Sequence, residues 1–134
     1  MMASPGFLNA SLLVAAGGAV GAWARYSAGA ILGRMGAATA QFPWSTLAVN
    51  IVGSLLMGLL AGWLARHGTG GESWRLLLGV GVLGGFTTFS AFSLELALMV
   101  ERGALTAAAA YVTISVLAGV VSLFAGLALM RAVA

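Results

Sequence analysis

The residue types best suited to chemistry are gathered in one stretch, Gly84–Glu95, which has the sequence GGFTTFSAFSLE. It opens with two adjacent glycines, which weaken a helix, and its hydroxyl side chains compete for backbone hydrogen bonds. Yet the stretch lies inside an apolar run long enough to cross a membrane. Irregular backbone at membrane depth is stable only where protein buries it or where it lines a watery cavity. We therefore expect a spanning helix that is broken near its middle, with an ion or substrate site at the break.

Aromatic rings and hydroxyls follow the expected break. Phe89 and Phe92 have i, i+3 spacing and so share one face of a helix. The edge of a phenyl ring is positive and attracts an anion, and the hydroxyls of Thr88, Ser90 and Ser93 add hydrogen-bond donors. This combination predicts a site for a small, hard anion. An aromatic pair at helical spacing is also typical of a lipid-facing or core surface, and that alternative stays open.

Polar side chains in the other apolar runs extend this site. Arg25 is the one basic residue deep within a run, where it would draw an anion into a vestibule; the alternative is a side chain that snorkels to the interface. Asn50 offers two N–H donors to an anion, or else a hydrogen bond that joins two helices. Tyr111 and Ser115 would continue the track of hydroxyls, although either can instead bond a neighbouring helix.

Backbone carbonyls around Gly84 and Thr87 are a second feature of the break. Carbonyl oxygens that helical hydrogen bonds do not use are hard ligands, suited to a small cation. If a two-fold axis passed here, two chains would present equivalent carbonyls to one central ion. The alternative is a glycine kink that threonine hydroxyls satisfy. Glu95, nearer the end of the run, is either a proton-coupling acid or a solvated one.

The composition is that of an integral membrane protein. Of 134 residues, 61% are hydrophobic and 7% are charged, and the mean hydropathy is +1.07, whereas a soluble domain carries about 25% charged residues. A spanning helix needs about 20 apolar residues, so four spans account for nearly the whole chain, which we interpret as a single domain, residues 1–134. The expected helices cover roughly residues 7–33, 44–65, 74–100 and 104–130.

Small residues and sparse charges predict how the helices assemble. The first, second and fourth runs carry stripes of glycine and hydroxyl residues at a spacing of four, which let helices approach closely. If both termini share one side, the arginines divide almost evenly between the two sides: Arg66, Arg75 and Arg131 against Arg34 and Arg102. Orientation follows the positive charge of short loops, so the chain should insert either way. This favours an antiparallel, dual-topology homodimer.

Three motifs, in order along the chain, are similar to those of the Fluc (CrcB) family of fluoride channels. Residues 84–95 resemble the third-helix signature G-G-[LFY]-T-T-F-S-T-F-S-x-E of that family. Residues 17–26, GGAVGAWARY, resemble its first-helix G-G-x-x-G-A-x-x-R-Y, and residues 46–54, TLAVNIVGS, resemble its second-helix T-L-x-V-N-x-x-G-S. The resemblance covers most of the chain, and three such motifs in order are highly specific.

The resemblance implies a dual-topology homodimer with two antiparallel fluoride pores, one along each side of the interface. It makes Phe89 and Phe92 the pore phenylalanines, contributed across the two subunits, and Asn50 the pore amide. Tyr111 and Ser115 would fall on a polar track.

The same resemblance implies a central structural sodium ion, to which Gly84 and Thr87 would give main-chain carbonyls, and it places Arg25 near the vestibule. The chain departs from the family pattern at Ala91, where threonine is common, and at Gly119, where a serine would continue the track. Both departures bear on the length of the polar track.

We therefore expect passive, fluoride-selective conduction across the bacterial plasma membrane, which would export fluoride and protect the cell from it. We expect no enzyme: cysteine is absent, His67 is the only histidine, and there is neither a P-loop for a nucleotide nor a dense basic patch for nucleic acid. The alternative is a small dual-topology, proton-coupled multidrug exporter, for which Glu95 would be the only candidate carboxylate. A third possibility is a membrane scaffold without transport activity.

Overall fold

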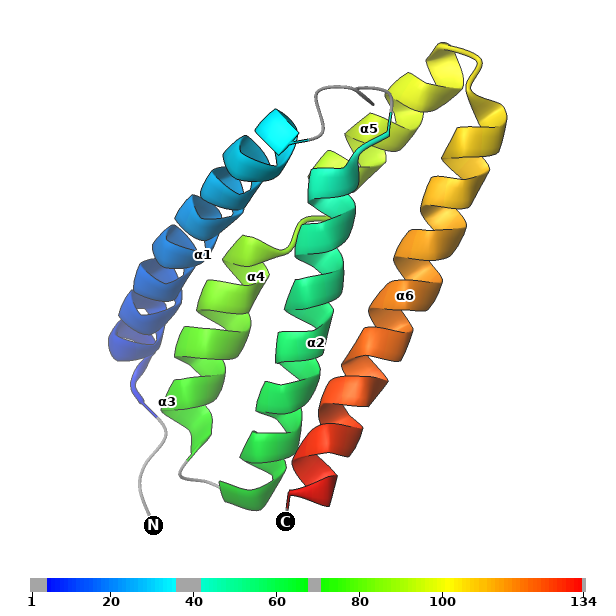
Figure 1. Cartoon of the computed structure of the whole chain (residues 1–134). Coiled ribbons are helices and arrows are strands. Elements are labelled where there is room, and N and C mark those ends of the chain that lie inside the picture. The colour runs from blue at the N-terminus through cyan, green and yellow to red at the C-terminus, as the bar shows by residue number, and fades with distance from the viewer. Residues whose placement is uncertain (1–4, 36–41, 68–70, 134) are drawn as a thin grey trace.

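Four long helices pack side by side in the computed structural model, which describes residues 5–35, 42–67 and 71–133 (Figure 1). Three of them are continuous: α1 (Phe7–Met35), α2 (Trp44–His67) and α6 (Leu105–Ala132). The third is built from four segments: α3 (Glu72–Trp74), the π-helical η3 (Arg75–Leu83), α4 (Gly84–Phe86) and α5 (Ser90–Glu101). Successive long helices alternate in direction, so the start of α1 and the end of α6 lie at the same end of the bundle (Figure 1).

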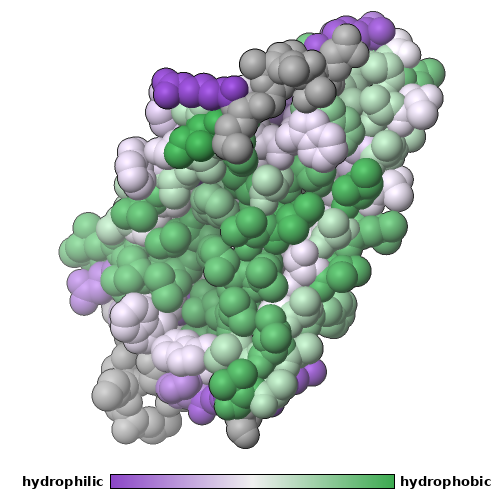
Figure 2. All heavy atoms as spheres, viewed as in Figure 1, coloured by the Kyte–Doolittle hydropathy of each residue, from purple (hydrophilic) through white to green (hydrophobic). Residues whose placement is uncertain are grey.

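All four helices are long and apolar enough to cross a membrane. Apolar residues dominate the middle of the molecule, while hydrophilic residues gather mainly toward its two ends (Figure 2). The all-helical architecture and the bent third span predicted from the sequence are therefore confirmed. Each helix begins and ends within two residues of the bounds expected for it. Of the connecting segments, residues 36–41 and 68–70 lie outside the described part of the chain.

Glycines set the close approach of α1 to the third span. A Cβ atom at Gly17 would overlap the carbonyl oxygen of Leu77, and one at Gly21 would overlap that of Val82. The first part of the glycine stripe is therefore a helix-packing surface, as small residues allow in a membrane. Gly29, farther along the same stripe, has nothing within 4 Å of an added Cβ.

Glycines likewise bring α2 and α6 together over much of their length. A Cβ at Gly58 would meet the carbonyl oxygen of Leu123, and one at Gly126 would meet that of Leu55. The two backbones are thus nearly in contact, which leaves the third span to fill the space between this pair and α1 (Figure 1).

The third span is interrupted at residues 87–89. α4 ends at Phe86, Thr87 has an extended backbone (φ −79°, ψ 159°), and α5 begins at Ser90. The sequence placed the weak point at the two glycines, Gly84 and Gly85, but both remain helical.

The helix therefore ends at the threonines, beyond the two glycines. The carbonyl oxygen of Leu83 accepts hydrogen bonds from both the N–H (3.0 Å) and the hydroxyl (2.8 Å) of Thr87. The N–H of Thr88 turns instead to a side chain of α2. The sequence suggested that Phe89 follows the break. In the structure Phe89 lies within it.

The break redirects the span between two neighbours. Before it, η3 and α4 pack against α1; after it, α5 packs against α6 (Figure 1). A small core lies beside the second half, where Leu47, Met99, Ala108 and Tyr111 are buried together. The break is therefore held from both sides by continuous helices.

Candidate functional site

A cavity of about 450 Å³ opens beside the break, between α2, the third span and α6. We call it the break cavity. Its wall brings together many of the residues that the sequence singled out: Asn50, Gly84, Thr87, Thr88, Phe89, Phe92 and Ser115. The other site residues proposed from the sequence lie outside its lining: Arg25, Ser90, Ser93 and Tyr111.

The carboxamide of Asn50 holds the middle of the break. Its Nδ2 donates to the carbonyl oxygen of Thr88 at 3.0 Å, and its Oδ1 accepts from the N–H of Thr88 at 2.8 Å. The N–H and the carbonyl group of Thr88 thereby have hydrogen-bond partners at a place where the helix no longer provides them. The hydrogen bond that joins two helices, one of the two roles considered for Asn50, is present, and it uses only one of the two amide N–H groups.

Four consecutive carbonyl groups remain without hydrogen bonds on the other side of the break. Within residues 5–35, 42–67 and 71–133, no donor reaches the oxygens of Gly84, Gly85, Phe86 or Thr87. The neighbouring threonine hydroxyls serve other groups, since that of Thr88 accepts from the N–H of Ala91 at 3.2 Å. Gly84 and Thr87 are also among the residues that line the cavity.

The two phenylalanines of the break differ in how they are held. The Phe89 ring is 79% exposed in the single chain, and its centroid lies 5.8 Å from that of Phe92. The Phe92 ring packs on Tyr111, with a centroid distance of 5.0 Å. Phe92 is thus anchored to the core, whereas Phe89 projects away from it.

The hydroxyls near the break fall into two groups. Ser93 Oγ donates to the carbonyl oxygen of Phe89 at 2.9 Å, and Ser90 Oγ lies 3.4 Å from the Thr88 hydroxyl. Ser115 Oγ is buried and has no hydrogen-bond partner among the described residues. A buried polar atom without a partner is costly, and residue Ser115 is part of the cavity wall.

Tyr111 occupies the core instead of the cavity. Its side chain is fully buried, and its hydroxyl donates to Glu95 Oε2 at 2.8 Å. Thr46 Oγ1 donates to the other carboxylate oxygen at 2.7 Å. Sequence reasoning gave Glu95 no partner and assigned no role to Thr46. The usable signal was a carboxyl group in an apolar run, which requires hydrogen-bond donors on neighbouring helices.

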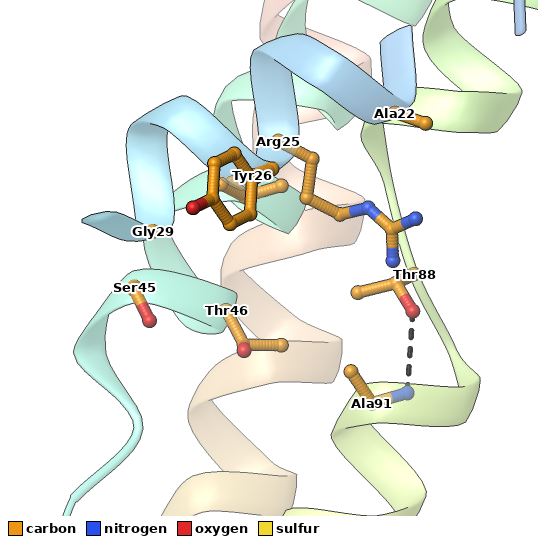
Figure 3. Close-up of a pocket in the computed structure, with 9 residues that line it drawn as sticks. Ala22, Arg25, Tyr26, Gly29, Ser45, Thr46, Thr88 and Ala91 are labelled. Atoms are coloured by element: carbon orange, nitrogen blue, oxygen red, sulfur yellow. Dashed lines mark hydrogen bonds between the residues drawn. The ribbon is translucent and has the colours of Figure 1, made fainter. Parts of the chain in front are cut away.

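Arg25 lies in a second cavity, of about 320 Å³, on the other side of the break. Its guanidinium extends from α1 toward Thr88, and Tyr26 and Thr46 also line the space (Figure 3). The one salt bridge of the described residues joins Arg75 to Glu72, so no carboxylate neutralises Arg25. Thr88 lines this Arg25 cavity as well as the break cavity and separates the two.

These features define the class of protein: a multi-pass membrane protein in which polar groups gather at a break in its third span. Residues 12–127 match the family described as CrcB-like protein, Camphor Resistance (CrcB). The chain belongs to this family. A protein of Novosphingobium aromaticivorans, named fluoride-specific ion channel FluC, is 61% identical over 95% of this chain and 100% of its own length. Proteins of the same name from Caulobacter vibrioides and Phenylobacterium zucineum are 54% and 59% identical, each over 94% of this chain and 98% of its own length.

Proposed function

We propose that this chain is a passive, fluoride-selective ion channel that exports fluoride from the cytoplasm across the plasma membrane and so protects the cell. The observation that carries the proposal is the wall of the break cavity. It combines the Asn50 amide, the Ser115 hydroxyl without a partner and the rings of Phe89 and Phe92, and it contains no carboxylate. The names of the relatives in three bacteria support the choice of fluoride.

An anion that loses its water molecules on entering the cavity needs other groups to replace the hydrogen bonds that water donated. The remaining N–H of Asn50 and the hydroxyl of Ser115 donate hydrogen bonds, and the positive ring edges of Phe89 and Phe92 face the ion. These groups suit a small, hard anion, and the names of the relatives support fluoride over larger halides. The sequence has no P-loop that would bind a nucleotide as an energy source, so we propose that fluoride crosses by passive electrodiffusion.

We propose that two copies assemble as an antiparallel homodimer and that each completes the pore of the other. The free carbonyl groups from Gly84 to Thr87 support this, because hydrocarbon cannot satisfy them and exposure to it is costly. The 79% exposure of the Phe89 ring in one chain supports it too. A second copy over the break would bury both features.

An antiparallel arrangement requires a chain that inserts in either orientation. Arg66, Arg75 and Arg131 lie at the end of the bundle where α1 begins and α6 ends, and Arg34 and Arg102 lie at the opposite end. The bias in positive charge is therefore small, as dual topology needs.

A structural sodium ion at the two-fold axis fits the chemistry of the break. The carbonyl oxygens of Gly84 and Thr87 would hold it, since they accept no hydrogen bond from the described residues and are hard donors. A bound cation would supply fixed positive charge that joins the two subunits.

Arg25 would give the pore its entrance. With no carboxylate partner, its guanidinium makes the Arg25 cavity electropositive, and Thr88 lines both this cavity and the break cavity. A positive vestibule raises the local concentration of anions.

Efflux from liposomes tests this function. Purified protein is reconstituted with fluoride inside, a potassium ionophore is added, and released fluoride is read with an electrode while chloride efflux is measured in parallel. Fast loss of fluoride without loss of chloride, and without a proton gradient, is the expected result. Silence for fluoride together with proton-driven uptake of an aromatic cation would favour the exporter, although the Glu95 carboxylate that it needs is held by Thr46 and Tyr111.

A further inference from the structure

A third cavity lies at the end of the bundle where α2 ends and the third span begins. It measures about 360 Å³, within the range of about 300–1,000 Å³ that small-molecule sites occupy. Its lining is apolar and aromatic throughout, from α2, α3, η3 and α6: Leu59, Leu60, Trp63, Trp74, Leu78 and Met130. We call it the Trp63 groove. None of these residues lines the break cavity or the Arg25 cavity.

Two tryptophans fix the depth of the groove in the membrane. The rings of Trp63 and Trp74 meet edge to face with a centroid distance of 6.4 Å. Indole rings at span ends sit at the level of the lipid headgroups. Leu59 precedes Trp63 by one turn of α2, and Leu78 follows Trp74 by about one turn, so the groove extends about 6 Å toward the bilayer centre. It thus leads from the headgroup level into the acyl-chain region.

Two arginines lie in the last helical turns at the headgroup end of the groove. Arg66 lies in the last turn of α2, and Arg131 follows the lining residue Met130 in the last turn of α6. Neither forms a salt bridge within the described residues. Arg75, by contrast, is held by Glu72 through two hydrogen bonds of 2.9 and 2.8 Å. Two arginines without a salt bridge therefore lie within three residues of Trp63 and Met130, at the end of the bundle where the groove lies.

We propose that the Trp63 groove binds one acyl chain of an anionic phospholipid, whose phosphate is held by Arg66 and Arg131. An apolar wall below and a basic rim above match an amphiphile with a negatively charged head. A zwitterionic lipid carries its own cation to the same rim and gains less from it. This site does not depend on the proposed fluoride pathway.

Native mass spectrometry of the full chain, purified in detergent, tests the proposal. Dioleoylphosphatidylglycerol and dioleoylphosphatidylcholine are titrated separately, and the fraction of lipid adducts is measured. We expect phosphatidylglycerol to bind more tightly, and Arg66→Gln and Arg131→Gln each to weaken it about fivefold. Arg34→Gln is the matched control, because Arg34 lies in the last turn of α1 at the opposite end of the bundle. It should change nothing.

A substitution within the groove tests the acyl-chain part of the site. Leu78→Trp should fill the space and weaken adducts of both lipids, while fluoride efflux stays within about twofold of the unsubstituted protein. Equal affinity for the two lipids, or an equal loss in Arg34→Gln, would overturn the proposal. So would dissociation of the subunits in Leu78→Trp, which would assign the groove to a contact between copies. Should Leu78→Trp fail to fold, the arginine variants decide the matter alone.

Discussion

Asn50 and Thr88 are joined by two hydrogen bonds, in which the carboxamide of one pairs with both backbone groups of the other. A continuous helix would have satisfied those backbone groups itself. The amide therefore replaces a piece of helix, and it fixes the broken span to α2 at the residue that separates the break cavity from the Arg25 cavity.

Asn50→Asp should abolish fluoride efflux. Aspartate still accepts from the N–H of Thr88, but it sets a negative oxygen against the carbonyl of Thr88 and removes the N–H donor from the pore. Leaving that carbonyl without a donor should lower the free energy of unfolding by about 1–3 kcal/mol. Efflux and thermal unfolding in detergent measure the two effects. Asn9→Asp, in the exposed first turn of α1, is the control. Normal efflux in Asn50→Asp would show that conduction does not need the amide.

Phe92→Ile should stop conduction while the protein stays folded. The substitution removes the ring edge from the cavity wall and the contact with Tyr111, yet leaves an apolar side chain in place. Efflux and size-exclusion chromatography give the readouts. Phe124→Ile is matched to it, because Phe124 is 63% exposed on α6 and should tolerate the change. An active Phe92→Ile channel would remove this ring from the pore.

Tyr111→Phe should reduce stability more than conduction. The hydroxyl is buried against Glu95 and does not line the break cavity. Its loss should cost about 1–3 kcal/mol of unfolding free energy, while fluoride efflux falls less than about tenfold and remains selective over chloride. Tyr26→Phe, at a residue that is 75% exposed, is the control for stability. Complete loss of efflux in a stable Tyr111→Phe protein would contradict this prediction and would indicate that the hydroxyl takes part in fluoride conduction.

Gly17→Ala and Gly18→Ala should have opposite effects on stability. An added methyl group at Gly17 collides with the carbonyl oxygen of Leu77, whereas one at Gly18 meets nothing within 4 Å. Overpacking at Gly17 should cost about 1–3 kcal/mol. At Gly18 the better helix propensity of alanine should gain up to about 1 kcal/mol. Equal thermal unfolding midpoints would contradict the close approach of α1 to η3.

Replacing sodium with a large organic cation during purification should weaken subunit association or fluoride efflux, because the carbonyl oxygens of Gly84 and Thr87 would lose their ligand. Potassium-only and sodium-only buffers at equal ionic strength separate ion identity from screening. Association and efflux that do not change at any sodium concentration would count against the ion.

Hydropathy and residue type were sufficient to predict the four spans and the interrupted third span. The bilayer imposes a length on each helix, and hydroxyl-rich sequence at membrane depth is incompatible with an ordinary lipid-facing helix. The sequence also identified Asn50, Phe89, Phe92 and Ser115, which meet in one cavity.

What the sequence did not predict depends on how the helices are aligned against one another. The break at residues 87–89 is held by the two hydrogen bonds between Asn50 and Thr88, and residue spacing within one span says nothing about a partner in another. The hydrogen bond between Thr46 and Glu95 also joins two spans, so residue spacing within either span could not predict it. Tyr111 was expected either on the polar track or bonded to a neighbouring helix, and the choice of Glu95 as its partner is set by the pairing of α5 with α6.

Because α1 begins and α6 ends at the same end of the bundle, reporter domains fused to either end of one chain would share a compartment (Figure 1). Reporters should therefore agree within each molecule, while a population with mixed orientations would give signal in both compartments. A tandem fusion of two copies through a soluble linker would force them to be parallel. Only a linker with one additional membrane crossing would yield the antiparallel pair from a single polypeptide.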